Sequence, residues 1–315
     1  MQAKIPRSGN FSERLNRWAI RRGFPVLAWI APRAPRWFLF VNARWIIAVV
    51  FFFHSRPKLA IARNLGRVLD APPESAQVRR ATDAMLRHLA YYWVDLFRFP
   101  QLPRERLREL IVGGDERALD PLRERLARGE RVLLMTAHLG NWELGAVMLG
   151  QAGLPLAIIY VPDEFEEAEQ FRSFMRNLSS VSEIPLPPDD RFASLAVLRA
   201  FGEGRLVALQ GDRDFRESGV EMTFFGAKTA FPTGPFLLAR MTGAILLPTF
   251  IAYAPDLRFE VEHGVPISVP RTADRDADVR QAMEQWVATL EAAVRRWPTQ
   301  WYTFYDFWNS GEGHA

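Results

Sequence analysis

The 315-residue chain contains no cysteine. Disulfides, cysteine–metal ligands and thiol nucleophiles are therefore excluded, and the absence fits a reducing compartment. Internal repeats and low-complexity segments are also missing, whereas hydrophobic residues make up 49% of the chain, enough for a sizeable core. Histidine is scarce, and no two histidines have metal-ligand spacing, so we predict no metal site. The five are His54, His88, His138, His263 and His314.

Acidic residues are almost absent from the first part of the chain. Residues 1–69 hold 13 Lys or Arg and a single acid, Glu13, which leaves 27 basic and 35 acidic residues for the rest. A basic arm on a mildly acidic body indicates an anionic partner, either nucleic acid or anionic lipid. The arm is rich in aliphatic and aromatic residues and has no recognised nucleic-acid-binding motif. We therefore predict an anionic membrane surface as the partner and no nucleic acid.

The most apolar run in this arm is short for a membrane span. Fifteen of the 17 residues from Trp37 to Phe53 are apolar, whereas a spanning helix needs about 20 apolar residues. Basic residues flank the run on both sides, so there is no positive-inside asymmetry. We predict a helix embedded in one leaflet, with a buried core helix as the alternative. An amphipathic stretch at residues 11–19 would add to this docking segment.

Short apolar runs alternate with helical periodicity along the rest of the chain. Buried strands are predicted at 131–137, 156–160, 205–210 and 244–251, with a half-exposed strand near 259–261. Helices are predicted at 76–97, 115–128, 141–150, 164–179, 195–201, 234–242 and 278–297. This alternation predicts an α/β fold with a mixed, mostly parallel sheet flanked by helices. We divide the chain into an N-terminal helical membrane-docking segment, residues 1–69, and an α/β domain, residues 70–315.

His138 is the histidine best placed for chemistry. It follows the predicted strand 131–137 in the turn before a helix, where ligands and catalytic groups gather in α/β sheets. Gly140 permits a tight turn, Asn141 can cap the helix, and Glu143 lies in the first helical turn. A carboxylate on one imidazole nitrogen leaves the other free to take a proton from a hydroxyl. Alternatively, His138 only caps the helix and Glu143 is an ordinary first-turn acid.

The stretch from His138 to Glu143 resembles the H-x4-D/E signature of the lysophospholipid and glycerolipid acyltransferase superfamily. It is most similar to the branch that contains the bacterial lipid A lauroyl/myristoyl acyltransferases and the phosphatidylinositol mannoside acyltransferases. Other segments resemble this branch in the same order along residues 60–308. They are Asn64-Leu65, Gln210 to Asp214, Gly219-Val220, Phe224 to Gly226, Gly234-Pro235, Thr242 to Pro248, Pro298 to Trp301 and Phe307-Trp308. The chain departs from the branch at Leu139 and Gly211.

The resemblance implies that His138 is a general base oriented by Glu143. Asp212, Arg213 and Asp214 follow the predicted strand 205–210 and would lie beside this base. The two aspartates would orient the acceptor or Arg213, and Arg213 would bind a phosphate or the oxyanion. The alternative is a turn held by its own side-chain hydrogen bonds, with a structural Arg–Asp pair.

Arg176 and four phenylalanines complete the candidate residues. The branch has a functional arginine near Arg176, which implies a substrate contact, and a solvated helix face is the alternative. The phenylalanines either line an acyl-chain groove or belong to the core. They are Phe215, Phe224, Phe225 and Phe231.

The resemblance implies a membrane-associated O-acyltransferase. Such an enzyme moves a fatty acyl group from a thioester of acyl carrier protein or coenzyme A to a hydroxyl of a lipid acceptor, as in lipid A or glycolipid biosynthesis. No serine or cysteine motif indicates a covalent intermediate, so we expect direct attack, without an organic cofactor or metal. The implied location is the cytoplasmic face of the bacterial inner membrane, monotopic or single-pass. A non-catalytic, lipid-binding member of the same family is the alternative.

Overall fold

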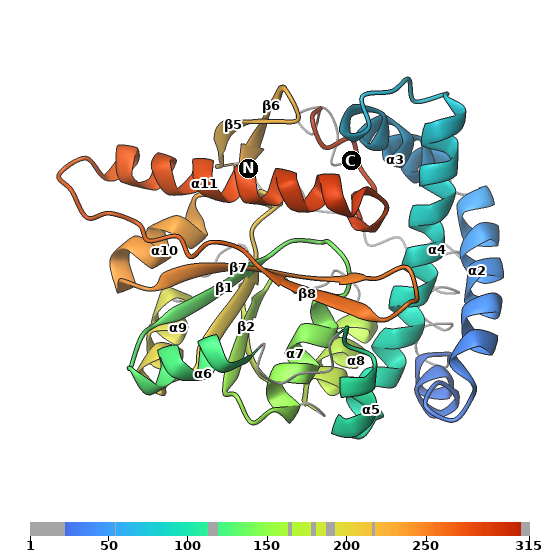
Figure 1. Cartoon of the computed structure of the whole chain (residues 1–315), viewed down its shortest axis with the longest axis horizontal. Coiled ribbons are helices and arrows are strands. Elements are labelled where there is room, and N and C mark those ends of the chain that lie inside the picture. The colour runs from blue at the N-terminus through green and yellow to red at the C-terminus, as the bar shows by residue number, and fades with distance from the viewer. Residues whose placement is uncertain are drawn as a thin grey trace.

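A six-stranded sheet forms the centre of the molecule (Figure 1). The computed structural model describes residues 23–53, 55–112, 119–162, 166–177, 181–186, 193–215 and 218–309. The strand order is β3-β2-β4-β1-β7-β8; the first five strands pair in parallel, and β8 is antiparallel to β7. The strands are β1 (Val132–Thr136), β2 (Leu156–Tyr160), β3 (Ser182–Pro185), β4 (Leu206–Gln210), β7 (Ile245–Tyr253) and β8 (Phe259–His263). The predicted fold class is confirmed.

Helices cover both faces of the sheet, which explains why its central strands are continuous apolar runs. Leu133 and Met135 of β1 pack in one cluster with α9 (Ala193–Gly202), α10 (Gly234–Thr242) and α11 (Arg275–Arg296). Val132 and Leu134 of the same strand pack on the other face, against α6 (Asp120–Ala127) and α7 (Trp142–Gln151). Alternate residues of β1 therefore enter two different cores.

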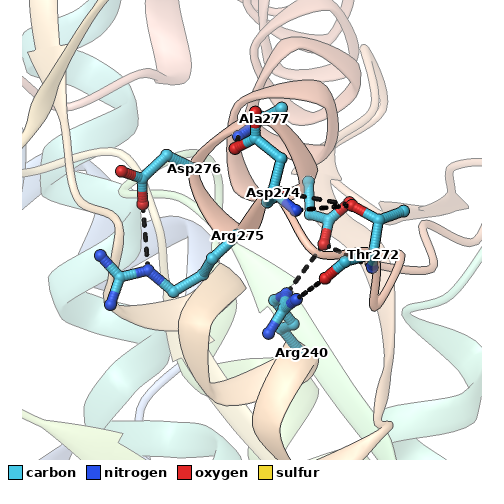
Figure 2. Close-up of polar contacts among 7 residues, drawn as sticks. Arg240, Thr272, Asp274, Arg275, Asp276 and Ala277 are labelled. Carbon is cyan, nitrogen blue, oxygen red and sulfur yellow. Dashed lines mark hydrogen bonds and ion pairs between the residues drawn. The ribbon is translucent and has the colours of Figure 1, made fainter.

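Polar side chains fix the beginning of α11, the long helix above the sheet (Figure 1). Figure 2 shows the contacts: Asp274 caps the helix by accepting the N–H of Ala277, and Arg240 of α10 donates to the Thr272 carbonyl. The buried Asp278 carboxylate accepts bonds from Arg240 and from Thr272. These bonds satisfy helix-terminal donors and tie α10 to α11.

A layer of helices lies along one side of the α/β body (Figure 1). It contains α2 (Arg36–Phe53), α3 (Ser55–Val68) and α4 (Ala76–Arg98). The buried face of α4 packs with α3 and with Tyr302. Farther along the chain come 3-10 helix η1 (Phe99–Gln101), α5 (Arg104–Glu109), α8 (Glu166–Asn177) and 3-10 helix η3 (Pro298–Gln300).

Helix α2 is mostly uncovered. Within the described residues it is the one helix long and apolar enough to cross a membrane, and 6% of it is buried. Its exposed side chains include Trp45 and Phe52, at 72% and 80% exposure. The alternative of a buried core helix is therefore wrong. The predicted amphipathic stretch at residues 11–19 lies outside the described residues.

One end of α2 is fastened to the body by a buried carboxylate. Arg36 donates to both oxygens of Asp95 on α4, at 3.0 and 2.6 Å, and the Tyr253 hydroxyl of β7 donates to the same carboxylate at 2.9 Å. Phe40 of α2 stacks on Tyr91 of α4 with ring centroids 4.2 Å apart. Asp95 is fully buried, so its charge depends on these partners.

A separate hairpin, β5 (Val220–Phe224) and β6 (Ala227–Phe231), lies outside the sheet. Its two-residue loop is Phe225-Gly226, and both residues have positive φ, at 49° and 74°. This geometry is the type I′ turn that suits the twist of paired strands. Phe224 and Phe231 point inward and are fully buried.

Candidate active site

The sheet register brings His138 and Asp212 together. Thr136 at the end of β1 is the partner of Gln210 at the end of the neighbouring parallel strand β4. His138 and Asp212 each follow two residues later. Two loops that leave adjacent parallel strands at the same edge meet there, although 74 residues separate these two positions in the chain.

Asp212 is the carboxylate that holds the imidazole of His138. Nδ1 of His138 lies 2.8 Å from Oδ1 of Asp212, and the backbone N–H of His138 donates to Oδ2 at 3.1 Å. An ionised carboxylate only accepts hydrogen bonds, so Nδ1 carries the proton and Nε2 is left with its lone pair. The His138 side chain is 13% exposed and that of Asp212 is fully buried.

The environment favours a neutral imidazole beside an ionised carboxylate. Burial lowers the pKa of His138, and the charge of Arg213 lowers it further, against the opposing effect of Asp212. Burial disfavours the Asp212 carboxylate, but His138 and Arg213 outweigh it and lower the pKa of Asp212 to about 2. Near neutral pH, His138 is therefore ready to accept a proton.

The turn that carries His138 is bonded on two sides. The N–H of Gly140 donates to the Gln300 carbonyl at 2.8 Å, and the N–H of Tyr302 donates to the His138 carbonyl at 2.7 Å. On the other side, the N–H of Asn141 donates to the Ile251 carbonyl at 2.7 Å. The turn thus has little freedom to move the imidazole away from the sheet edge.

Gly140 and Asn141 have the local roles that the sequence predicts. Gly140 has a φ of 67°, and a Cβ at this position would lie 1.9 Å from the Ile251 carbonyl oxygen, so only glycine fits. The Asn141 side chain accepts the N–H of Leu144 at 3.1 Å and is the N-cap of α7.

Glu143 does not occupy the orienting position that the resemblance implies. It lies in the first turn of α7, and its carboxylate is 3.4 Å from a guanidinium nitrogen of Arg176 on α8. Asp212 holds Nδ1 of His138 instead. The sequence analysis placed Asp212 beside His138 but gave it the acceptor or Arg213 as its partner, so the hydrogen bond between Asp212 and the imidazole was not predicted.

Arg176 is buried rather than on a solvated helix face. It is 7% exposed and lies 2.9 Å from Glu183 and 3.4 Å from Glu169, in addition to Glu143. Its guanidinium lies over the Tyr160 ring at 4.5 Å, and its buried Nε lacks a hydrogen-bond partner. A substrate contact by Arg176 stays a prediction.

Arg213 and Asp214 brace the loop around Asp212. Arg213 donates to the Tyr302 carbonyl at 2.5 Å and lies over the Tyr305 ring at 5.6 Å. The Asp214 carboxylate accepts the N–H of Gly219. The Asp214 contact fits the predicted alternative of a turn held by its own side chains, whereas Arg213 bonds to a distant segment. The implied roles in binding acceptor, phosphate or oxyanion stay predictions.

An apolar cavity of about 110 Å³ lies between α7 and the sheet. Its lining includes Leu134, Ala146, Leu149 and Ile158, and Glu143, Arg176 and Gln210 supply polar atoms at the carboxyl edge of the strands. Trp142 also lines the cavity, and its ring centroid is 5.4 Å from that of His138. The Trp142 side chain therefore lies next to both the cavity and the imidazole of His138.

The predicted phenylalanine groove is not at this cavity. Phe224 and Phe231 are fully buried in the core, and Phe225 is 8% exposed, so the core alternative holds for these three. Phe215 differs, because it is 59% exposed and its ring centroid is 6.5 Å from that of His138.

Within the described residues, no three His, Asp or Glu side chains gather as metal ligands.

The bacterial lipid A biosynthesis acyltransferase family matches residues 13–310. The chain belongs to this family. Phosphatidylinositol mannoside acyltransferase of Mycobacterium tuberculosis (strain ATCC 25618 / H37Rv) is 32% identical over 251 residues, which cover 78% of this chain and 75% of the relative. The protein of the same name from Mycolicibacterium smegmatis is 28% identical over 251 residues, 79% of this chain and 78% of that protein.

Membership in the lipid A biosynthesis acyltransferase family confirms the resemblance seen in the sequence. The protein is an acyltransferase of lipid biosynthesis, and an apolar helix, α2, is available at its surface. The sequence analysis placed Asp212 beside His138 but missed the hydrogen bond between the two side chains. The missed signal was the parallel register of two strands that both end two residues before a titratable side chain.

Proposed function

We propose that this acyltransferase moves a fatty acyl group from an acyl thioester to a hydroxyl of a membrane lipid, with His138 as the general base. The His138–Asp212 pair supports this proposal most strongly. Asp212 holds Nδ1–H at 2.8 Å, and burial keeps the imidazole neutral. Nε2 is the atom that would take the proton from the acceptor hydroxyl.

The proposed reaction needs no acyl-enzyme. The acceptor oxygen attacks the thioester carbonyl carbon as its proton passes to Nε2 of His138. The tetrahedral intermediate collapses, the C–S bond breaks, and the imidazolium returns the proton to the leaving thiolate. Asp212 stabilises the imidazolium between these two steps, as a buried carboxylate does in base-and-orienter pairs.

The first few methylenes of the acyl chain would enter the cavity between α7 and the sheet, whose volume is about 110 Å³. The cavity is lined mainly by apolar side chains and reaches the sheet edge where Glu143 and Arg176 pair. A thioester carbonyl held at that edge would have the start of its acyl chain in the cavity and its carbonyl carbon near His138. Arg176, Arg213 and Asp214 are the proposed substrate contacts around it.

We propose a glycolipid acceptor, either a lipid A precursor or a phosphatidylinositol mannoside. The names of the relatives support this class. The donor would be acyl carrier protein or coenzyme A thioester. The proposed location is the cytoplasmic face of the bacterial inner membrane.

Helix α2 would lie flat in one leaflet. It runs beside α4 (Figure 1), and α4 carries the exposed charges Arg79, Asp83 and Arg87. A transmembrane α2 would draw these charges into hydrocarbon, where each is costly. Flat insertion leaves them in water.

Purified protein in detergent, labelled acyl thioesters and a panel of lipid acceptors test the function. Wild type should transfer acyl groups, and His138→Ala should lose about a hundredfold or more of the rate, as expected when a general base is removed. Transfer that survives His138→Ala would overturn the mechanism. No transfer to any acceptor would overturn the proposed reaction.

A further inference from the structure

Three hydrogen-bond donors converge on the Asp212 carboxylate, and one comes from Trp301. The indole Nε1–H of Trp301 donates to Oδ2 at 3.3 Å, beside the backbone N–H of His138. Asp212 is 0% exposed and Trp301 is 1% exposed. An ionised carboxylate without water needs donors on both oxygens. Trp301 is therefore one of the three donors that contact the Asp212 carboxylate.

The position of the Trp301 ring is itself fixed. It packs edge-on against Phe307 and Phe224, with centroids 4.8 and 5.6 Å away. Its backbone forms an antiparallel bridge with Leu139, next to His138. Packing and backbone pairing therefore both restrain the ring that carries the indole N–H.

The preceding residue ties the same segment to the sheet. The Gln300 side chain accepts the N–H of Tyr253 at 2.7 Å and donates to its carbonyl at 2.9 Å. The Gln300 carbonyl accepts the N–H of Gly140. The segment Gln300–Tyr302 is therefore bonded both to the His138 turn and to β7.

We propose that Trp301 is a positioning residue for acyl transfer: its indole N–H holds the Asp212 carboxylate at the place from which Asp212 orients His138. The inference rests on the proposed role of His138 as general base. Trp301 acts through Asp212, so its removal should lower kcat while KM for donor and acceptor stays near the wild-type value.

Loss of the indole N–H has a defined electrostatic sign. The freed oxygen leaves more negative charge facing the imidazole, which favours the imidazolium and raises the pKa of His138. A hydrogen bond to a charged group corresponds to about one to two pH units at that group. His138 senses the loss only through Asp212, so its pKa should rise by up to about one unit. The acid limb of the kcat/KM profile should move to higher pH by the same amount. In addition, kcat should fall about tenfold, because a carboxylate with one donor fewer holds the imidazole in a less fixed direction.

The test compares Trp301→Phe with Trp308→Phe. Trp308 belongs to the same aromatic cluster, 6.1 Å from the Trp301 ring, and its indole donates to the Phe224 carbonyl at 3.0 Å. Both variants thus lose one indole hydrogen bond, but only Trp301→Phe removes a donor from Asp212. NMR titration of histidine-labelled protein, assigned with His138→Gln, reads the pKa of His138 without turnover, and thermal unfolding reads stability.

We expect the two variants to lose similar amounts of thermal stability. Only Trp301→Phe should raise the pKa of His138 and move the acid limb of the kcat/KM profile to higher pH. Equal pKa values and profiles in the two variants would overturn the inference. If Trp301→Phe does not fold, site-specific benzothienylalanine at position 301 keeps the ring shape without the N–H, and the same shift is required of it. Absence of transfer by wild type would overturn the proposed function, whereas the titration alone decides whether Trp301 controls the pair.

Discussion

At the scale of single residues, the carboxylate that pairs with His138 differs between the sequence-based prediction and the structure. The local H-x4-E spacing favours Glu143, and the fold supplies Asp212. The difference has a chemical consequence. Asp212 is fully buried with three donors around it, whereas Glu143 neutralises a buried arginine. The two carboxylates thus have different electrostatic tasks.

Substitution of each carboxylate by its amide should separate these tasks. Asp212→Asn should lower kcat about a hundredfold or more, because the amide no longer fixes the tautomer or stabilises the imidazolium. It should also lower the pKa of His138, since Asp212 is the group that raises it. Glu143→Gln should leave the pKa of His138 unchanged, because Glu143 pairs with Arg176 and not with His138. NMR titration gives the pKa of His138 in each variant, and steady-state kinetics gives kcat. If the pKa of His138 in Asp212→Asn equals the wild-type value, Asp212 is not the group that holds His138.

The pH dependence of transfer follows from the same pair. A general base works only when it is neutral, so kcat/KM falls as the pH falls through the folded-state pKa of His138. Burial lowers that pKa. The acid limb should therefore lie below about pH 6.5, the ordinary histidine value, with a plateau at pH 7. A limb above pH 7 in the kcat/KM profile would contradict a buried, neutral base.

At the scale of elements, long periodic helices and buried strands were predictable. The strand at 156–160 and the helix at 234–242 have the predicted bounds, and α4 and α11 differ from theirs by one to three residues. Their apolar positions recur with one period over the whole element. Strand β3 was missed because Ser182–Pro185 has no apolar run, and the β5–β6 hairpin was missed because Phe225-Gly226 lacks the usual Asn-Gly signal.

The site itself was predictable only in part. His138, Gly140 and Asn141 belong to one turn, and their local chemistry is visible in the sequence. The approach of Asp212 depends on β4 lying beside β1, although β2 and β3 come between them in the chain. No local pattern specifies that order of strands.

The turn between β1 and α7 should tolerate no side chain at Gly140. Gly140→Ala places Cβ against the Ile251 backbone in a left-handed conformation, which should destabilise the fold by about 3 kcal/mol or more and remove activity. Gly153→Ala is the matched control, because Gly153 has a φ of 73° and open space around it. It should cost only about 1 kcal/mol. Chemical denaturation of both variants gives the comparison; equal losses would mean that the clash is relieved elsewhere.

At the scale of the whole molecule, the exposed apolar face of α2 is the kind of surface that marks an interaction site. The Arg36–Asp95 pair and the Phe40–Tyr91 stack fasten this helix to α4. Lipid contact by α2 would therefore orient the entire α/β body. A helix on a flexible linker would not do so.

Vesicle binding should depend on the exposed rings of α2. Replacing Trp45 and Phe52 together by Asp should weaken partition into anionic vesicles roughly a hundredfold or more, since each ring loses its transfer from water. Leu195→Asp on α9, at 58% exposure, is the control for an exposed apolar residue elsewhere. Sedimentation with vesicles measures binding, and thermal unfolding should be unchanged. Equal binding by the double variant and the control would contradict lipid docking through α2.

The bonds that Gln300–Tyr302 make to the His138 turn also order events during protein synthesis. Helix α2 leaves the ribosome early, whereas residues 300–302 emerge only after every strand of the sheet and all of α11. A nascent chain that stops within α11 has His138 and Asp212 but lacks the Trp301, Gln300 and Tyr302 bonds around them. Translation therefore delivers the apolar helix first and the contacts around His138 and Asp212 last, so that a chain cut short inside α11 would contain these two residues without the bonds that Gln300–Tyr302 add.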